Sequence, residues 1–278
     1  MASKTWFVTG ASAGIGHAVT EQLLERGDRV AATARRPEVL SDLADRFGNR
    51  LWTASLDVTD TKALNETVER AFADLGQIDV VYSNAGRGSV GAAEEMTVAS
   101  IDEQIALNMT APIHLLRAAL PHFRAQGGGR FIQMSTMGAH ITTPGASMYH
   151  ASKWGVEGFF ESVIAEVEPF DVGITMVEPG IIRTTFGANI DVAPAMPEYA
   201  DGPAGQIRAY IAGVDNVTAE ASGDPQKVAA AIIASAHSTP APRRLALGSD
   251  AYNAMRTALT GRLAELDAGK QTAASIDF

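Results

Sequence analysis

Tyr149 and Lys153 are the residues of this 278-residue chain whose types and spacing most directly suggest chemistry. On a helix, residues four apart lie on one face, so the Lys153 ammonium can lie beside the Tyr149 phenol. A free tyrosine has a pKa of about 10, and a neighbouring cation favours the phenolate and lowers that pKa. The spacing therefore predicts a tyrosine that serves as a general acid or base. Such pairs also arise on solvated helix surfaces, so the pair needs support from the rest of the chain.

A glycine-rich segment near the N-terminus is the second candidate site, with the sequence Thr9-Gly10-Ala11-Ser12-Ala13-Gly14-Ile15-Gly16. It follows an apolar run and precedes a helical pattern. Glycines in such a turn let the backbone approach a pyrophosphate, which then lies at the positive end of the helix. The spacing is G-x-x-x-G-x-G, which differs from the standard G-x-G-x-x-G fingerprint. Its position after the first expected strand favours cofactor binding over a purely structural turn.

The second expected strand ends in Thr33-Ala34-Arg35-Arg36. NAD-binding sites place an acid near this point to bond the ribose 2′-hydroxyl, whereas an arginine accommodates a 2′-phosphate. There is no acid at 33–36 and there are two arginines, so the sequence favours NADP(H) over NAD(H), with Arg35 the stronger candidate. The alternative is that both arginines are solvated charges at the start of a helix.

The elements that must position these residues follow the alternation typical of βαβ units around a parallel sheet. Strands are expected at 5–8, 29–33, 50–55, 78–82, 130–134, 173–177 and 244–247. Helices are expected at 15–26, from about 37, and at 60–75, 98–124, 147–168, 224–237 and 250–267. The segment 184–223, rich in Gly, Pro, Ala and Asp, predicts an irregular substrate-binding flap. The prediction is an α/β fold with a Rossmann-like doubly wound parallel sheet of about seven strands, forming a single NAD(P)-binding domain over 1–278.

Composition excludes several classes of function. The hydrophobic fraction of 46% and the charged fraction of 19% are typical of a globular protein. A formal charge of −10 argues against a nucleic-acid partner. The absence of cysteine and of metal-ligand spacing among the six histidines predicts no metal site. No apolar stretch approaches the ~20 residues of a membrane span, and no signal-peptide core follows the N-terminus. A cytoplasmic protein without a membrane partner is therefore expected.

Taken in order, these motifs resemble the short-chain dehydrogenase/reductase family, in its shorter single-domain branch, over about residues 4–184. Thr9–Gly16 resembles the family's T-G-x-x-x-G-x-G cofactor loop. Residues 83–86, Ser-Asn-Ala-Gly, resemble N-N-A-G with its first Asn replaced by Ser, and residues 179–184 resemble the P-G-x-x-x-T segment beside the nicotinamide amide. The resemblance implies that the cofactor contacts Gly10, Ser12, Ala13, Gly14, Ile15, Gly16, Arg35, Arg36, Asp57, Val58, Asn84, Ala85, Gly86, Tyr149, Lys153, Pro179, Gly180, Ile182 and Thr184.

The same resemblance implies a catalytic set. Tyr149 and Lys153 match the family's catalytic pair, and Asn108 matches the helix asparagine whose backbone holds a water of the proton relay. The family's substrate-polarising serine lies thirteen residues before the tyrosine, which is Thr136 here. An ungapped reading favours Thr136, whose hydroxyl can donate the same hydrogen bond. A one-residue insertion between 138 and 149 would give that role to Ser135.

The implied activity is hydride transfer between NADP(H) and a carbonyl or secondary alcohol, with Tyr149 exchanging the proton. Candidates for the substrate pocket are Met137, His140, Thr143, Met148 and Phe186, which suggest an apolar ketone or aldehyde. Two alternatives remain: a catalytically silent NADP-binding regulator, and a reductase of an acyl-thioester or lipid-like ketone. The family also suggests a homodimer or homotetramer. The acidic residues at 94–103 and 157–171 are expected on solvated helix faces, without a chemical role.

Overall fold

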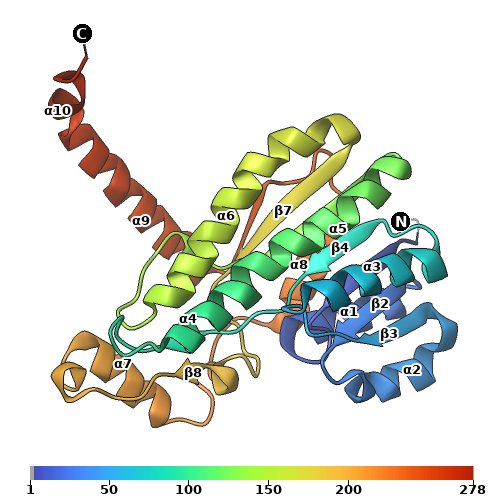
Figure 1. The fold of residues 1–278 in the computed structure, drawn as a ribbon, viewed down its shortest axis with the longest axis horizontal. Helices are drawn as coiled ribbons and strands as arrows, with labels where there is room; N and C mark the ends of the chain where they lie inside the picture. Colours follow the sequence, from blue (N-terminus) through green and yellow to red (C-terminus); the bar gives the residue numbers. More distant parts are fainter. Residues whose placement is uncertain (1–2, 278) are drawn as a thin grey trace.

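A seven-stranded parallel sheet forms the centre of the molecule, which is a computed structural model that describes residues 3–277 (Figure 1). Residues 1, 2 and 278 of the predicted domain lie outside the described residues. The strand order is β3-β2-β1-β4-β6-β7-β9, which confirms the predicted doubly wound sheet. The direction of winding reverses between β1 and β4, and ligands of such sheets bind outside the carboxyl ends of the strands at this point. The strands are β1 (Thr5–Thr9), β2 (Arg29–Ala34), β3 (Leu51–Ser55), β4 (Val80–Ser83), β6 (Gly129–Met134), β7 (Val172–Pro179) and β9 (Arg244–Leu247).

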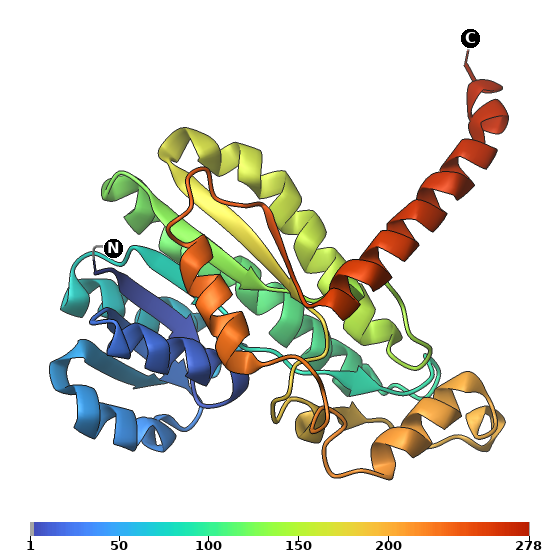
Figure 2. The ribbon, with the colours of Figure 1, turned by 180° about the vertical axis from the view of Figure 1, so that it is seen from behind.

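Helices cover both faces of the sheet, and each face has its own apolar core. Because side chains alternate along a strand, Trp6 and Val8 of β1 enter one buried cluster while Phe7 enters the other. The first cluster lies under α1 and α8, seen in Figure 2, and the second under α3, α5 and α6, seen in Figure 1. The helices are α1 (Gly14–Glu25), α2 (Ser41–Phe47), α3 (Thr61–Leu75), α4 (Val98–Ile105), α5 (Ala111–Ala125), α6 (Ser147–Val167), α7 (Pro203–Ala212), α8 (Pro225–Ser235), α9 (Ser249–Ala268) and α10 (Lys270–Ala274).

The long helix predicted over 98–124 is interrupted. Helix α4 ends at Ile105, a π-helical turn spans Ala106–Thr110, and α5 follows. Pro112 has no N–H to donate to the carbonyl of Asn108 four residues earlier, so a regular helix cannot be completed there. Wider turns of this kind are often found at functional sites. Asn108, one of the predicted catalytic residues, lies inside the turn.

The flap predicted over 184–223 is irregular over more than half of its length, but it includes several short regular elements. It contains β8 (Asp191–Val192), which pairs in parallel with β5 (Ser89–Val90), two single-turn helices at Gly187–Asn189 and Pro197–Tyr199, and helix α7. Buried Glu95 anchors it by accepting hydrogen bonds from the N–H groups of Ala92, at 2.7 Å, and Met196, at 2.9 Å, and by pairing with Arg208. These bonds lower the pKa of Glu95. The expectation of a solvated acid at this position is therefore wrong, because donors from the chain replace water.

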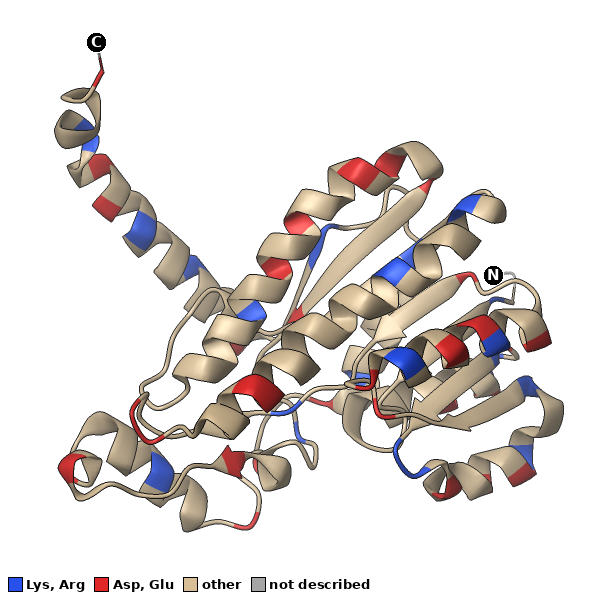
Figure 3. Ribbon diagram, in the orientation of Figure 1, with Lys and Arg blue, Asp and Glu red and all other residues tan. Residues whose placement is uncertain are grey.

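Helices α9 and α10 extend away from the sheet (Figures 1 and 2), and residues 263–277 are all exposed. Acidic and basic residues are interspersed along α3 and α9 (Figure 3). Among the described residues, every helix is too short or too polar to cross a membrane.

Candidate active site

The glycine-rich turn after β1 is held by the neighbouring strand β4. Gly10 and Gly14 adopt φ angles of +65° and +56°, which side chains rarely tolerate. The Asn84 side chain donates to the carbonyls of Thr9, at 3.0 Å, and Gly10, at 3.1 Å. A Cβ atom at Gly16 would collide with the Asn84 amide and the Gly10 carbonyl. Asn84, predicted to contact the cofactor, thus shapes the turn through its side chain.

The start of α1 has the features that a pyrophosphate requires. Helix α1 begins at Gly14, its N-cap residue Ala13 makes no side-chain hydrogen bond, and its first turn has no acid. The N–H groups of this turn are therefore available to an external acceptor at the positive end of the helix. Thr184, from the flap, faces this turn, since a Cβ at Gly14 would lie 3.4 Å from the Thr184 Cβ. The residues present fit a dinucleotide between turn and flap.

Arg35 and Asp57 lie at the same edge of the sheet, at the carboxyl ends of β2 and β3. Asp57 Oδ1 accepts hydrogen bonds from the Thr59 N–H at 2.9 Å and the Thr59 hydroxyl at 2.7 Å. These bonds lower the pKa of Asp57, and the charge of Arg35 lowers it further. Arg35 and Arg36 are both exposed. An exposed arginine next to the expected adenosine end of the site has the chemistry to bind a 2′-phosphate.

Tyr149 lies half-buried in the first turns of α6, with the ring centroid of Phe186 at 6.3 Å. Burial raises the pKa of Tyr149, and a hydrogen bond with the Thr136 side chain offsets part of the rise. The predicted lowering of this pKa by Lys153 is therefore wrong for the protein alone. The physical reason is that desolvation of the phenol outweighs the attraction of its neighbours. At neutral pH, Tyr149 therefore holds its proton.

Lys153 lies one helical turn further along α6 and is buried, with 5% of its surface exposed. Its ammonium donates a hydrogen bond to the carbonyl of Met134 at 3.0 Å. Burial lowers the pKa of Lys153 to about 8, and the charge of Glu157 acts in the opposite direction. With this pKa, Lys153 loses its charge just above physiological pH.

Thr136 and Ser135 follow β6, but their side chains contact different residues. Thr136 Oγ1 accepts from the Gly138 N–H at 3.1 Å, and its hydroxyl lies close enough to Tyr149 to lower the pKa of the phenol. Ser135 is buried, and its hydroxyl donates to Glu157. Of the two candidates for the polarising hydroxyl, Thr136 is the one that the structure brings to Tyr149.

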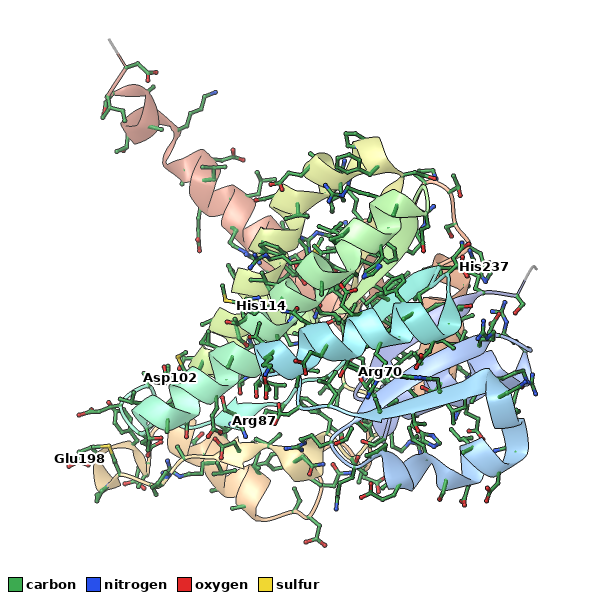
Figure 4. All side chains as sticks on the ribbon, turned by 45° about the vertical axis from the view of Figure 1, so that its right-hand side comes forward. Arg70, Arg87, Asp102, His114, Glu198 and His237 are labelled. Carbon is green, nitrogen blue, oxygen red and sulfur yellow. The ribbon has the colours of Figure 1, made fainter. Side chains whose placement is uncertain are left out.

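Asn108 links the π-helical turn to α6. Its side-chain amide donates to the Arg87 carbonyl at 2.9 Å and to the Ser152 hydroxyl at 3.3 Å, and Ser152 donates to the Tyr149 carbonyl at 2.7 Å. Figure 4 shows Arg87 close to the helix that carries Asp102, where Arg87 pairs with Glu103 at 2.6 Å. Ser152, which is outside the predicted catalytic set, therefore connects Asn108 to the turn bearing Tyr149.

The predicted nicotinamide-amide segment at 179–184 is fixed at both ends. The Ile181 N–H donates to Asp250 at 2.8 Å, and a Cβ at Gly180 would collide with the same carboxylate. The Thr184 carbonyl accepts from the Thr218 hydroxyl at 2.7 Å. This segment therefore spans the gap between the β9–α9 junction and the end of the flap.

On the substrate side, Phe186 lies between Tyr149 and Gly88, since a Cβ at Gly88 would lie 3.3 Å from the Phe186 ring. His140 is different: its Nε2 lies 3.0 Å from Glu178 Oε1 and 3.0 Å from the guanidinium of Arg244. Glu178 and Arg244 thus hold the His140 ring, and the place of His140 in the substrate pocket stays a prediction.

Glu157 is the residue of this region that sequence reasoning missed. It is 3% exposed, although the acids at 157–171 were expected to be solvated. A signal was present: positions 149, 153 and 157 share one helix face, on which Tyr149 and Lys153 already point inward. Arg244, the partner of Glu157, lies on β9, 87 residues away, and no local sequence pattern predicts this contact.

Comparison with known proteins agrees with this geometry. The family model described as short chain dehydrogenase matches residues 4–194. Oxidoreductase BOA17 of Botryotinia fuckeliana is 35% identical over 250 residues, which cover 90% of each chain. The NADP-dependent 3-hydroxy acid dehydrogenase YdfG of Escherichia coli is 30% identical over 184 residues, covering 66% of this chain and 74% of that protein.

The crystal structure of a short-chain dehydrogenase from Streptomyces avermitilis superposes with a TM-score of 0.91 and 36% identity, covering 100% of both chains. The match therefore extends over the flap and the projecting C-terminal helices as well as the sheet. The chain belongs to the short-chain dehydrogenase/reductase family and is an oxidoreductase.

Proposed function

We propose that this protein is an NADP(H)-dependent oxidoreductase that interconverts a carbonyl and a secondary alcohol, with Tyr149 as the general acid and base. The observation that carries the proposal is the convergence of Tyr149, Thr136 and Lys153 at the carboxyl end of β6. The bound dinucleotide supplies or accepts the hydride. Tyr149 donates its proton to the developing alkoxide, and Thr136 holds the same oxygen.

Lys153 and Asn108 support this exchange. The Lys153 ammonium adds positive charge beside the phenol, which favours the phenolate when the reaction runs toward oxidation. The carbonyl of Asn108, left without its helical donor by Pro112, is available to hold a water between Lys153 and solvent. The hydrogen bonds from Asn108 to Ser152 and from Ser152 to the Tyr149 carbonyl keep Asn108 and the start of α6 in fixed relative positions.

NADP(H) is the proposed cofactor because Arg35 is exposed at the end of β2 and residues 33–36 contain no acid. The E. coli relative described as NADP-dependent supports the same choice. Replacing Arg35 by Asp is expected to weaken NADPH binding by about 30- to 100-fold while changing NADH affinity by less than about 3-fold. Fluorescence titration with both dinucleotides measures the two constants. Equal losses for both would contradict the 2′-phosphate assignment. Arg117→Asp, an exposed arginine on α5 outside the predicted cofactor contacts, is the matched control.

Thr136 is proposed as the polarising residue, because Ser135 is committed to Glu157. Thr136→Ala is expected to lower kcat by about 100-fold, the typical effect of removing one donor to an oxyanion. Thr136→Ser should retain most of the activity, since it keeps the hydroxyl. Steady-state assays of these variants beside Ser135→Ala decide the assignment, which fails if Ser135→Ala loses kcat and Thr136→Ala does not.

The proposal as a whole is tested by titrating the protein with NADPH and following NADPH oxidation with a 3-keto ester, an aryl ketone and a long-chain aldehyde. Tight binding with turnover of one of these carbonyls supports the oxidoreductase assignment. Tight binding without turnover, with these and with 3-hydroxy acids plus NADP⁺ in the reverse direction, would favour a regulator that binds the dinucleotide without catalysis.

A further inference from the structure

Three consecutive residues at the end of β6 contact three residues on one face of α6. The Thr136 hydroxyl lies close enough to Tyr149 to lower its pKa, the Met134 carbonyl accepts from Lys153, and the Ser135 hydroxyl donates to Glu157. Positions 149, 153 and 157 are each one helical turn apart. The face that carries the proposed catalytic pair thus continues, without a break, to a buried carboxylate.

Charged groups from four elements surround Glu157. Arg244 of β9 donates to Glu157 Oε2 and to Glu178 Oε1 of β7, and its Nε and Nη2 donate to Glu161 of α6, at 3.0 and 2.7 Å. His140, which follows β6, has its Nε2 3.6 Å from Glu157 Oε2. Lys153 lies one turn before Glu157 on α6.

This cluster has no need of a metal ion. The ligand atoms of His140, Glu157 and Glu178 lie within 4.8 Å of one another, a spacing that suits a cation. The Arg244 guanidinium already donates to both carboxylates and lies 3.0 Å from the His140 nitrogen. Arginine therefore fills the position that a metal would take.

A carboxylate in this position has a consequence for Lys153. A buried ammonium is unfavourable unless a counter-charge lies close by. Burial lowers the pKa of Lys153 to about 8, and Glu157 is the charge that opposes this fall. Burial and the charge of Glu178 raise the pKa of Glu157, while the hydrogen bonds from Ser135 and Arg244 act against that rise. Arg244 and Ser135 thus help to keep Glu157 ionised.

We propose that Glu157 is a positioning residue for catalysis: it is the counter-charge that keeps Lys153 protonated in a site shielded from water, and Arg244 holds it in place. The effect of Glu157 on turnover rests on the proposed function, but the charge coupling between Glu157 and Lys153 does not. The coupling is a property of the protein without substrate or dinucleotide, so the two claims are tested separately.

Nuclear magnetic resonance of the lysine Hε and Cε atoms measures the coupling directly. The chain has only five lysines, Lys4, Lys62, Lys153, Lys227 and Lys270, so the Lys153 signal can be assigned by its loss in Lys153→Met. In the wild-type protein its titration midpoint is expected near pH 8. In Glu157→Gln we expect the midpoint to fall by about one pH unit, because the amide keeps the shape and removes the charge.

Three further variants separate the effect of the Glu157 charge from structural effects of the substitution. Glu157→Asp, which keeps the charge, should leave the midpoint close to that of the wild type. Glu161→Gln, an exposed partner of Arg244 on the same helix, should leave it unchanged. Glu157→Met is the second neutral variant if Glu157→Gln does not fold, because apolar side chains often replace buried ions without loss of stability.

The kinetic readout is the pH profile of kcat/KM with NADPH. The alkaline fall in activity should begin about one pH unit lower in Glu157→Gln, with activity at pH 6 within about 3-fold of the wild type. An unchanged Lys153 midpoint in both neutral variants would overturn the proposal. A loss of kcat/KM that is uniform across pH would assign Glu157 a merely structural role and would also overturn it. A shifted midpoint without turnover in the wild-type protein would leave the coupling standing and refute the oxidoreductase proposal instead.

Discussion

Replacing Tyr149 by Phe is expected to reduce kcat/KM for carbonyl reduction by about 1,000- to 10,000-fold, the range in which a positioned general acid contributes. The change removes one oxygen atom. The ring contacts with His150, at 5.8 Å between centroids, and with Phe186, at 6.3 Å, are retained. The pKa of Tyr149 is raised by burial, so the wild-type residue carries the proton that reduction consumes. Tyr149→Phe has no phenolic proton to donate.

NADPH binding should separate this chemical effect from a structural one. Because the turn after β1 and the start of α1 do not depend on the phenol, the Kd of Tyr149→Phe for NADPH should stay within about 3-fold of the wild type. Tyr252→Phe, on an exposed face of α9, is the matched control and should be fully active. A Tyr149→Phe enzyme with wild-type kcat would refute the tyrosine's role.

Replacing Lys153 by Met should have the second-largest effect, with opposite consequences for activity and stability. Turnover should fall by about 100- to 1,000-fold, since the variant lacks the charge that stabilises the phenolate and the donor expected to contact the cofactor. Below pH 8 the variant should also be about 1–2 kcal/mol more stable, because a buried ammonium is removed and the cost of leaving the Met134 carbonyl unpaired offsets only part of the gain.

The size of this stability difference depends on pH. The folded-state pKa of about 8 lies below the ordinary value of 10.5, so the folded protein releases a proton first as pH rises. Below pH 8 burial of the charge is fully unfavourable, and between pH 8 and 10.5 this penalty is relieved. The difference in unfolding free energy between variant and wild type should therefore be largest below pH 8 and should shrink toward pH 10. Urea unfolding at pH 7 and pH 9.5 measures it, and a constant difference would contradict the assigned pKa.

Local patterns predicted the fold and the elements that carry the candidate site. The strand at 244–247 was predicted with the bounds it has, and α6 was predicted to within one residue at its C-terminal end. The glycine spacing located the turn after β1 because Gly10 and Gly14 have positive φ angles, which are a local requirement of the turn. The interruption at Asn108 had a local cause as well, in Pro112, but helical periodicity on both sides concealed it.

Contacts between distant segments were not predictable in the same way. Glu95, in the turn before α4, and Glu157, on α6, look like ordinary surface acids until Arg208 and Arg244 are brought to them from 113 and 87 residues away. His140 likewise contacts Glu178 of β7 and Arg244 of β9, neither of which is near it in the sequence. The pKa of Tyr149 was misjudged for a related reason, since the degree of burial is a property of the whole fold.

The most direct test of the central claim is to follow deuterium from NADPH labelled at both C4 positions into the product of whichever carbonyl the protein reduces. Mass spectrometry of the product alcohol is expected to show one deuterium at the carbinol carbon for each NADPH consumed, with transfer slowed by about 1,000-fold or more in Tyr149→Phe. NADPH consumption without deuterium at that carbon, or transfer at the wild-type rate in Tyr149→Phe, would contradict hydride transfer governed by this tyrosine.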